Sequence, residues 1–367
     1  MAARWRSILL TPNILGKDGV SALSREMARA LPEPTLVISL HEAPVAAVRS
    51  PVGVEVQGAR GSRAAFFANA LQAARLSTSD VTIACSHLHL APIARAAAMV
   101  AGHGTRPAVV LCGIEAWVPA RLLERWGLAG SRVLAISQHT VDRFKAANPG
   151  LAPLDVTVCH PGLAAAAAAA PRPGPSPVAL IVARMSAAER YKGHDALLDV
   201  WPQVTAAHPD AVLAIAGDGD DRPRLEARVR ELGLESAVSF IGKIGDNALA
   251  GLYARSRFFV MPSRDEGFGL VFLEAMRAAK PCIGGTGAAS EIIQHGVTGF
   301  VIDPESRTAL LATMLRLYAE PDTCAQLGKT GRERFLAEFT DRHFQARFLR
   351  IIGREPDTPT TSKPVAA

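Results

Sequence analysis

The chain has 367 residues, of which 49% are hydrophobic and only 5% aromatic. This length is too great for one ordinary core and suits two domains, and the composition excludes a disordered or repetitive chain. The net charge of +6 falls within residues 1–171, where 16 Lys and Arg stand against 10 Asp and Glu; residues 172–367 hold 24 of each. The imbalance favours an anionic partner for the first half (a membrane surface, a phosphate or a nucleic acid), with incidental Arg-rich composition as the alternative.

The pattern of apolar residues also excludes several classes of protein. No apolar run approaches the ~20 residues that span a bilayer, and the first residues lack the apolar core of a signal peptide. The five cysteines are scattered and form no C-x-x-C pair. We therefore expect a cytoplasmic protein with neither a disulfide framework nor a zinc site.

The first half alternates short apolar runs with helical stretches. A helix is predicted where Val20, Leu23, Met27 and Leu31 share one face. Short buried strands separated by helices are typical of a parallel sheet covered on both faces. The expected strands are 7–11, 35–40, 80–84, 107–111 and 132–136.

A change of composition separates the two halves. Residues 164–170 are an unbroken alanine run, and four prolines follow within 171–177. Proline stops a helix, so we interpret 161–177 as a linker between an N-terminal domain (1–160) and a C-terminal domain (178–340). A surface loop within one domain is the alternative interpretation.

The second half repeats the alternation more clearly. Its predicted helices include one with Leu197, Val200 and Val204 on one face, and another over about 269–279. A helix over 341–353 is expected to pack back on the N-terminal domain, and 354–367 to be a disordered tail. The predicted fold is therefore α/β, with two Rossmann-like doubly wound domains and a cleft between the carboxyl ends of their strands. The expected strands are 178–183, 211–216, 238–241, 258–261 and 281–284.

The most informative stretch is 261–285, where a strand leads through a glycine-containing loop into a helix. Gly267 and Gly269 flank Phe268, which allows backbone N–H groups to approach a ligand closely. The N-terminus of the following helix suits phosphate oxygens. Glu266 in the loop and Glu274 on the helix could accept hydrogen bonds from sugar and ribose hydroxyls.

A second candidate site directly follows the strand at 178–183. Arg184 and Lys192 stand at its two ends, and an Arg fork with a Lys point charge suits a diphosphate. Basic residues after a strand are usually solvated, so this signal alone is weak. Arg190 lies between them and leaves open which cation matters.

Taken together, these segments resemble the retaining GT-B glycosyltransferases of family 4. The stretch from Glu266 to Glu274 is similar to the E-x7-E motif of that family, and Arg184 with Lys192 to its phosphate-binding pair. The resemblance covers nearly the whole chain and is strongest over 178–303. Five further segments carry it: Lys17-Asp-Gly-Val-Ser, Cys112-Gly-Ile-Glu-Ala-Trp, Ala216-Gly-Asp-Gly, Phe240-Ile-Gly-Lys and His295-Gly-Val-Thr-Gly-Phe.

The resemblance implies a role for each matching residue. Glu274 would hold the nucleotide ribose and Glu266 would contact the donor sugar. The two cations, Arg184 and Lys192, would bind the diphosphate and act with Glu266 in catalysis. Gly19 would approach the phosphates from the N-terminal domain when the cleft closes. Backbone contacts to the donor would come from Gly267, Phe268 and Gly269.

One departure from the family concerns the acceptor side. Cys112 stands where the family often has a histidine, so the role of that histidine would be absent or supplied by His87, His89 or Glu115. These four residues are the acceptor-side candidates. His87 and His89 could instead be metal ligands, but no partner cluster accompanies them in the sequence.

Two other motifs are weaker. Asp218 and Asp220 spell D-x-D, which holds a divalent metal in other transferases, but here they follow a strand in an ordinary loop position. The same loop does not complete the G-x-G-x-x-G pattern of dinucleotide binding, because Arg222 stands at its last glycine. We expect no metal and no cofactor, and a dehydrogenase is remote.

These observations predict a retaining transferase that moves a hexose from a nucleoside-diphosphate sugar to a hydroxyl acceptor. The resemblance implies cell-envelope or exopolysaccharide synthesis, with a sugar or a lipid-linked sugar as acceptor. The alternatives are a sugar-nucleotide epimerase, a phosphorylase, or a non-catalytic nucleotide-sugar-binding protein of the same fold.

The basic first half also predicts a peripheral location at an anionic inner-membrane surface, and no nucleic-acid partner. Arg60, Arg63 and Arg75 bracket an apolar stretch at helical spacing, in which Phe66 or Phe67 could insert into the interface. The alternative is that these apolar residues simply face the sheet.

Overall fold

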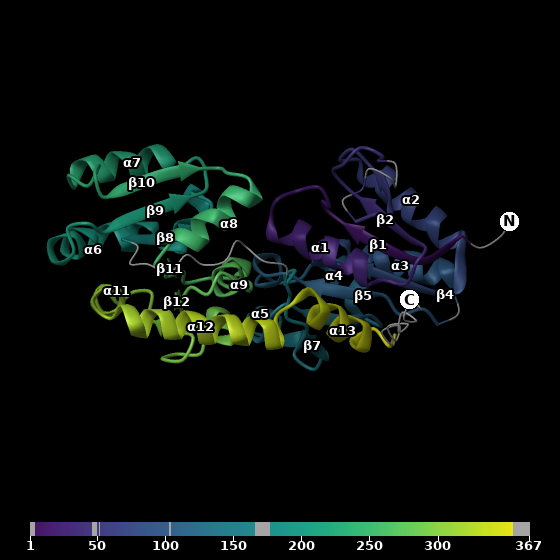
Figure 1. The fold of residues 1–367 in the computed structure, drawn as a ribbon. Coiled ribbons are helices and arrows are strands. Elements are labelled where there is room, and N and C mark those ends of the chain that lie inside the picture. Colours follow the sequence, from purple (N-terminus) through teal and green to yellow (C-terminus); the bar gives the residue numbers. More distant parts are fainter. Residues whose placement is uncertain (1–3, 46–49, 51, 103, 166–176, 355–367) are drawn as a thin grey trace, which may run out of the picture. The chain divides into compact units, whose positions relative to one another are not determined.

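The structure, a computed structural model, describes residues 4–45, 50, 52–102, 104–165 and 177–354. The chain divides into two compact units: the first comprises Met1–Ile136, Arg143–Cys159 and Arg342–Ala367, and the second Ser137–Asp142 and His160–Asp341. Each unit is built around one parallel sheet (Figure 1). The expectation of two doubly wound α/β domains is therefore confirmed.

The first unit has a seven-stranded parallel sheet in the order β3-β2-β1-β4-β5-β6-β7. Its central strands are apolar on both faces because helices cover both sides, as the sequence predicted. The strand order reverses direction between β1 and β4, so the loops after these strands form the topological switch point of the unit. The elements are β1 (Trp5–Thr11), α1 (Gly19–Ala30), β2 (Thr35–Ser39), β3 (Glu55–Gly58), α2 (Arg63–Arg75), β4 (Ser77–Cys85), η2 (Leu88–Leu90), α3 (Ala91–Ala101), β5 (Ala108–Leu111), η3 (Ile114–Ala116), α4 (Leu122–Leu128), β6 (Arg132–Ala135), η4 (Pro149–Leu151) and β7 (Val156–Val158), with α5 (Gln138–Ala147) shared between the units and α13 (Asp341–Ile351) joining the first unit from Arg342.

The second unit has a six-stranded parallel sheet in the order β10-β9-β8-β11-β12-β13, and Figure 1 shows the strands from β10 to β12 in teal and green. Its switch point lies between β8 and β11. The elements are β8 (Val178–Val182), η5 (Ala187–Lys192), α6 (His194–Ala207), β9 (Val212–Ala216), α7 (Arg222–Glu231), β10 (Val238–Gly242), α8 (Asp246–Arg255), β11 (Phe258–Met261), α9 (Leu270–Arg277), β12 (Cys282–Gly285), α10 (Ala289–Ile292), β13 (Gly299–Ile302), α11 (Arg307–Ala319) and α12 (Pro321–Glu338).

The predicted linker and tail lie largely outside the described residues, which stop at 165, resume at 177 and end at 354. The first part of the predicted linker packs within the second unit. Leu163 pairs with Thr340 in a parallel bridge, and its N–H donates to the Phe339 carbonyl at 3.0 Å. The first residue of the predicted tail, Arg354, is described and donates to the Thr82 hydroxyl at 2.9 Å within the first unit.

Of the two residues that were expected to insert into a membrane interface, the structure rules out one. Phe66 is fully buried against the sheet of the first unit, so it cannot insert into a lipid interface; among the large apolar residues of α2, Phe67 is exposed. Over the residues that the structure describes, every helix is too short or too polar to cross a bilayer.

Candidate functional site

The switch point of the second unit carries the predicted cations and one predicted carboxylate. Arg184 and Lys192 belong to the loop that follows β8, and Glu266 to the loop that follows β11. These strands are neighbours in the sheet, so their following loops meet at its carboxyl edge. Open parallel sheets bind ligands at this position.

Lys192 and Glu266 form a close ion pair at that edge. The Lys192 Nζ lies 2.5 Å from Glu266 Oε1, and the two side chains are only 15% and 13% exposed. The Ser263 hydroxyl also donates to Glu266 Oε1 at 3.2 Å. An ammonium group has three donors, so Lys192 can hold Glu266 and a phosphate oxygen at the same time.

The two arginines in the loop after β8, Arg184 and Arg190, differ in exposure and in partners. Arg184 is 71% exposed and contacts Glu189 at 2.5 Å. Arg190 instead donates to both carboxylate oxygens of Asp221, at 3.1 and 2.8 Å. Asp221 is buried, and hydrogen bonds from Arg224 and then Arg190 lower its pKa to about 2. Arg190 therefore fastens the loop, whereas Arg184 keeps most of its guanidinium open to a ligand.

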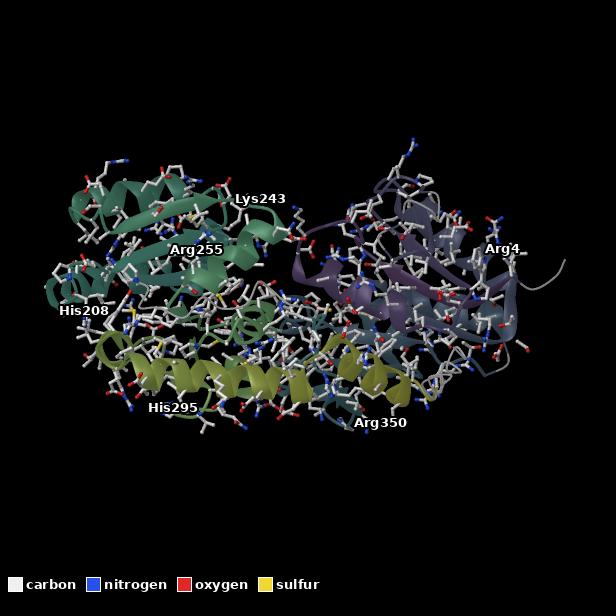
Figure 2. The ribbon with its side chains drawn as sticks, viewed as in Figure 1. Arg4, His208, Lys243, Arg255, His295 and Arg350 are labelled. Carbon is white, nitrogen blue, oxygen red and sulfur yellow. The ribbon has the colours of Figure 1, made fainter. Side chains whose placement is uncertain are left out.

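Glu274 lies on α9 in a partly buried position. Its Oε2 accepts a hydrogen bond of 2.9 Å from the Tyr253 hydroxyl on α8. Burial raises the pKa of Glu274, and burial also raises the pKa of Tyr253 well above its ordinary value. Tyr253 therefore stays protonated and fixes one carboxylate oxygen, which orients the side chain. Two exposed cations lie at the ends of the same helix: Lys243 precedes α8, and Arg255 is its last residue (Figure 2).

The glycine loop leading into α9 is shaped by close packing. Gly269 has φ of +96°, and a Cβ at this position would lie 2.6 Å from the Phe272 ring. Phe268 is only 3% exposed and its ring stacks on His160 at 5.5 Å. Phe268 thus anchors the loop, and its backbone is the part left for a ligand.

The structure adds a set of loop-fixing residues that sequence reasoning missed. The Gly267 carbonyl accepts hydrogen bonds from the Ser137 and Thr140 hydroxyls, at 2.6 and 3.2 Å. Glu291 accepts from two backbone N–H groups at the start of α5, at 2.8 Å each, and from His160 at 2.9 Å. The two hydroxyls hold Gly267 from 130 and 127 residues away, and Glu291 holds the start of α5 beside them. No local motif marks such residues, since only the topology brings them together.

The D-x-D stretch is engaged in structural contacts. Asp218 Oδ1 accepts from the N–H of Gly219 at 3.0 Å, and Asp220 Oδ1 accepts from the N–H of Ala187 at 3.2 Å. A Cβ at Gly217, whose φ is +133°, would lie 2.0 Å from the Ala183 carbonyl oxygen, so this loop packs directly on the loop after β8. Within the described residues no three His, Cys, Asp or Glu side chains form a group able to hold a metal ion.

In the first unit, Gly19 is the first residue of α1 and follows a loop that side-chain hydrogen bonds hold in place. Asp18 caps the helix, and Glu42 Oε1 accepts from the N–H groups of Ile14 and Leu15 at 2.8 and 2.7 Å. Arg25 donates to two carbonyls of the same loop, at 2.8 and 2.7 Å. The loop after β1 is thus held from both sides.

The four acceptor-side candidates gather at the carboxyl edge of β4 and β5. The rings of His87 and His89 lie 4.8 Å apart, and His89 Nδ1 is 2.6 Å from Glu124 Oε1. The Cys112 N–H donates to Glu115 Oε1 at 2.6 Å. Burial lowers the pKa of His87, whereas burial, with Glu115 nearby, raises the pKa of Cys112 well above its ordinary value. Cys112 is therefore a neutral thiol and His87 a neutral imidazole near pH 7.

The structure therefore assembles the predicted site residues into two groups, each within its own unit. The donor-side group is Arg184, Lys192, Glu266, Gly267, Phe268, Gly269 and Glu274; the other group is Gly19, His87, His89, Cys112 and Glu115.

Comparison with known proteins gives these groups a family context. Residues 167–334 match the family "Glycosyl transferases group 1". The chain is 27% identical over 279 residues to a GDP-mannose-dependent alpha-(1-6)-phosphatidylinositol monomannoside mannosyltransferase of Mycobacterium tuberculosis, covering 72% of this chain and 68% of that protein. It is 31% identical over 185 residues, 48% of each chain, to a GDP-mannose-dependent mannosyltransferase of Corynebacterium glutamicum that acts on monoacylated phosphatidylinositol monomannoside.

Among solved structures, the Anabaena protein HepE in complex with UDP and glucose has the same fold. Its TM-score is 0.79 at 19% identity, covering 95% of this chain and all of that one. The expected GT-B architecture is confirmed. The chain therefore has the GT-B fold, and its residues 167–334 are similar to the glycosyl transferases group 1.

Proposed function

We propose that the protein transfers a hexose, with retention of configuration, from a nucleoside-diphosphate sugar to a hydroxyl of a lipid-linked sugar. The observation that carries this proposal is the convergence of Arg184, Lys192 and Glu266 at the switch point of the second unit. Two cations and a carboxylate at such a position suit a diphosphate joined to a hydroxyl-rich sugar.

The proposed chemistry uses the charge that develops on the leaving diphosphate. The bond between the anomeric carbon and the phosphate oxygen breaks, the acceptor oxygen bonds to the same face, and the acceptor proton passes to a phosphate oxygen. Arg184 and Lys192 stabilise the departing anion as charges held where negative charge develops. Glu266 orients the sugar and holds Lys192, and no protein nucleophile is required.

Glu274 is assigned to the nucleotide ribose. A carboxylate with one oxygen fixed by Tyr253 keeps its other oxygen for a ribose hydroxyl. Backbone groups of residues 267–269 contribute further contacts to the donor.

A lipid-linked acceptor is favoured by the relatives and by charge. Both mannosyltransferases named above act on phosphatidylinositol mannosides, and the whole +6 excess falls in residues 1–171. We infer a role in cell-envelope or exopolysaccharide glycan synthesis, at the cytoplasmic face of the inner membrane.

The reaction is proposed to need no metal. Asp221 is committed to two arginines, and Asp218 and Asp220 accept from backbone N–H groups, so the carboxylates of this loop have other partners. The two cations of the switch point already supply the charge that a divalent metal would bring.

A panel of nucleotide sugars in a thermal-shift assay tests the donor assignment. A donor present at 100 times its Kd stabilises the folded state by about 2.7 kcal/mol, which raises Tm measurably. The best donor is then incubated with lipid-linked acceptors, and the anomeric configuration of the product is read by NMR. Inversion, or turnover of the donor without an acceptor, would contradict the proposal; the latter would favour an epimerase.

A further inference from the structure

The segment from η3 to α4 of the first unit exposes its apolar side chains instead of burying them. Leu122 is 83% and Leu123 70% exposed, and Trp126 on the same helix is 39% exposed. Just before the helix, Ile114 and Val118 are each about half exposed. We name these five residues the α4 apolar surface. A concentration of this kind is rare on monomeric proteins and marks an interaction site.

The residues that α4 buries determine which of its residues face outward. Glu124, Gly127 and Leu128 are buried at helical spacing, and a Cβ at Gly127 would lie 2.5 Å from the carbonyl carbon of Ala91. Glu124 accepts from the Arg121 N–H at 2.8 Å and contacts His89 at 2.6 Å. Rotating the helix to bury its leucines would break these contacts, so the outward apolar face is fixed by the fold.

The charges around the α4 apolar surface are positive. Arg121 and Arg125 are exposed, and within the described part of the chain neither forms an ion pair with a carboxylate. Arg95 from α3 stacks over the Trp126 ring at 4.6 Å. The two acidic residues of the segment are turned inward, Glu115 to the Cys112 N–H and Glu124 to His89. The outward face therefore combines aliphatic side chains, a tryptophan and unopposed arginines.

We propose that the α4 apolar surface inserts into an anionic lipid bilayer. Tryptophan favours the headgroup level, leucines enter the acyl boundary, and arginines contact anionic headgroups while their stems cover apolar area. The uncompensated positive charge is what favours a lipid surface over a second copy of this chain. α2 is the weaker candidate, since it exposes Phe67 alone among its large apolar residues.

The location links this surface to the acceptor. Ile114 adjoins Glu115, and the contact between His89 and Glu124 joins α4 to the acceptor-side candidates. A bilayer bound here would present a lipid-linked hydroxyl beside His87, His89, Cys112 and Glu115. This step rests on the proposed lipid-linked acceptor; the membrane contact itself does not.

Cosedimentation of the full chain with vesicles tests the proposal. The probes are vesicles of phosphatidylglycerol mixed with phosphatidylcholine, and of phosphatidylcholine alone, across a salt series. We expect Leu122→Ser/Leu123→Ser to lower partitioning onto anionic vesicles by at least about tenfold, and Arg121→Gln/Arg125→Gln by several-fold at low salt only. Matched controls are Phe67→Ser on α2 and Leu336→Ser in the second unit, which should bind like wild type.

Three results would overturn the proposal. They are unchanged partitioning of the leucine variant, a loss equal to that of Phe67→Ser, and conversion of a wild-type dimer to a monomer by the leucine variant with vesicle binding intact. Donor-induced thermal stabilisation is measured in parallel and should stay at the wild-type value in every variant. If wild type binds vesicles but no nucleotide sugar stabilises it, the proposed function fails and the membrane contact stands.

Discussion

Replacing Glu274 by alanine is the sharpest test of the donor-side geometry. In the structure its carboxylate accepts from the Tyr253 hydroxyl at 2.9 Å, which leaves one oxygen for a ribose hydroxyl. A hydrogen bond to a charged group contributes about 1.5–3 kcal/mol. Losing it should weaken binding of a nucleotide sugar roughly 10- to 150-fold, measured by calorimetric titration. Glu266→Ala should mainly lower turnover, because the proposed function assigns Glu266 to the sugar and not to the nucleotide.

Two companion variants separate a direct contact from a general disturbance. Tyr253→Phe removes only the hydroxyl that orients Glu274, so it should cost a few-fold in affinity. Glu226→Ala removes a carboxylate paired with Arg222 on α7, and its affinity should match wild type. Wild-type affinity in Glu274→Ala, or an equal loss in Glu226→Ala, would refute the ribose assignment.

The pH dependence gives an independent readout of the same contact. Burial raises the pKa of Glu274, so this carboxyl gains its proton at a higher pH than an exposed glutamate does. The ionised form is the better acceptor for ribose hydroxyls, so affinity should be full above the raised pKa and fall as pH drops through it. In Glu274→Gln this part of the pH profile should disappear. An identical profile in that variant would show that another group titrates.

The remaining predictions concern the cations, the metal and the loop after β9. Arg184→Ala and Lys192→Ala should each lower kcat/KM roughly 100- to 1000-fold, whereas Arg190→Ala should mainly lower Tm; equal rate losses in all three would contradict this division. Transfer should survive chelation and dialysis, and a loss that magnesium or manganese restores would show that a metal is needed. Asp221→Asn should lower the free energy of unfolding by about 1–2 kcal/mol at pH 7, because two arginines depress the pKa of this carboxyl from 3.8 to about 2. That contribution is present above pH 3.8 and lost as pH falls through about 2, so denaturation curves of variant and wild type should converge in acid; a constant difference would count against the ion pairs.

Much of the fold could be predicted because local patterns determine it. Buried parallel strands appear in the sequence as short runs of valine, leucine and isoleucine, and the strands β8 to β12 of the second unit lie within a residue or two of the predicted ones. The loop from Glu266 to Gly269 was also recognisable, since its glycines and its carboxylate are adjacent in sequence. The short strands β3, β7 and β13 went unpredicted because three- and four-residue edge strands carry too little periodicity.

Contacts between distant segments could not be predicted. Arg184 and Arg190 look alike in the sequence, and only the fold shows that Arg190 is bound by Asp221, 31 residues away. The hydroxyls of Ser137 and Thr140 hold the Gly267 carbonyl from 130 and 127 residues away. Such partners are single polar residues without a motif, so their role depends on topology that a local pattern does not encode.

The placement of the α4 apolar surface could not be predicted for a similar reason. Phe66 and Phe67 are adjacent on α2 and point about 100° apart, so spacing alone did not decide which one faces the sheet. On α4 the buried residues include a glutamate and a glycine. Hydrophobic periodicity alone would predict that the exposed leucines of this helix are buried. The inversion is stable because Glu124 gains polar partners inside and Gly127 permits the close approach of α3. The fold therefore holds an apolar face outward on α4, beside the acceptor-side candidates. This is better evidence for a lipid contact than an apolar helix recognised from sequence alone.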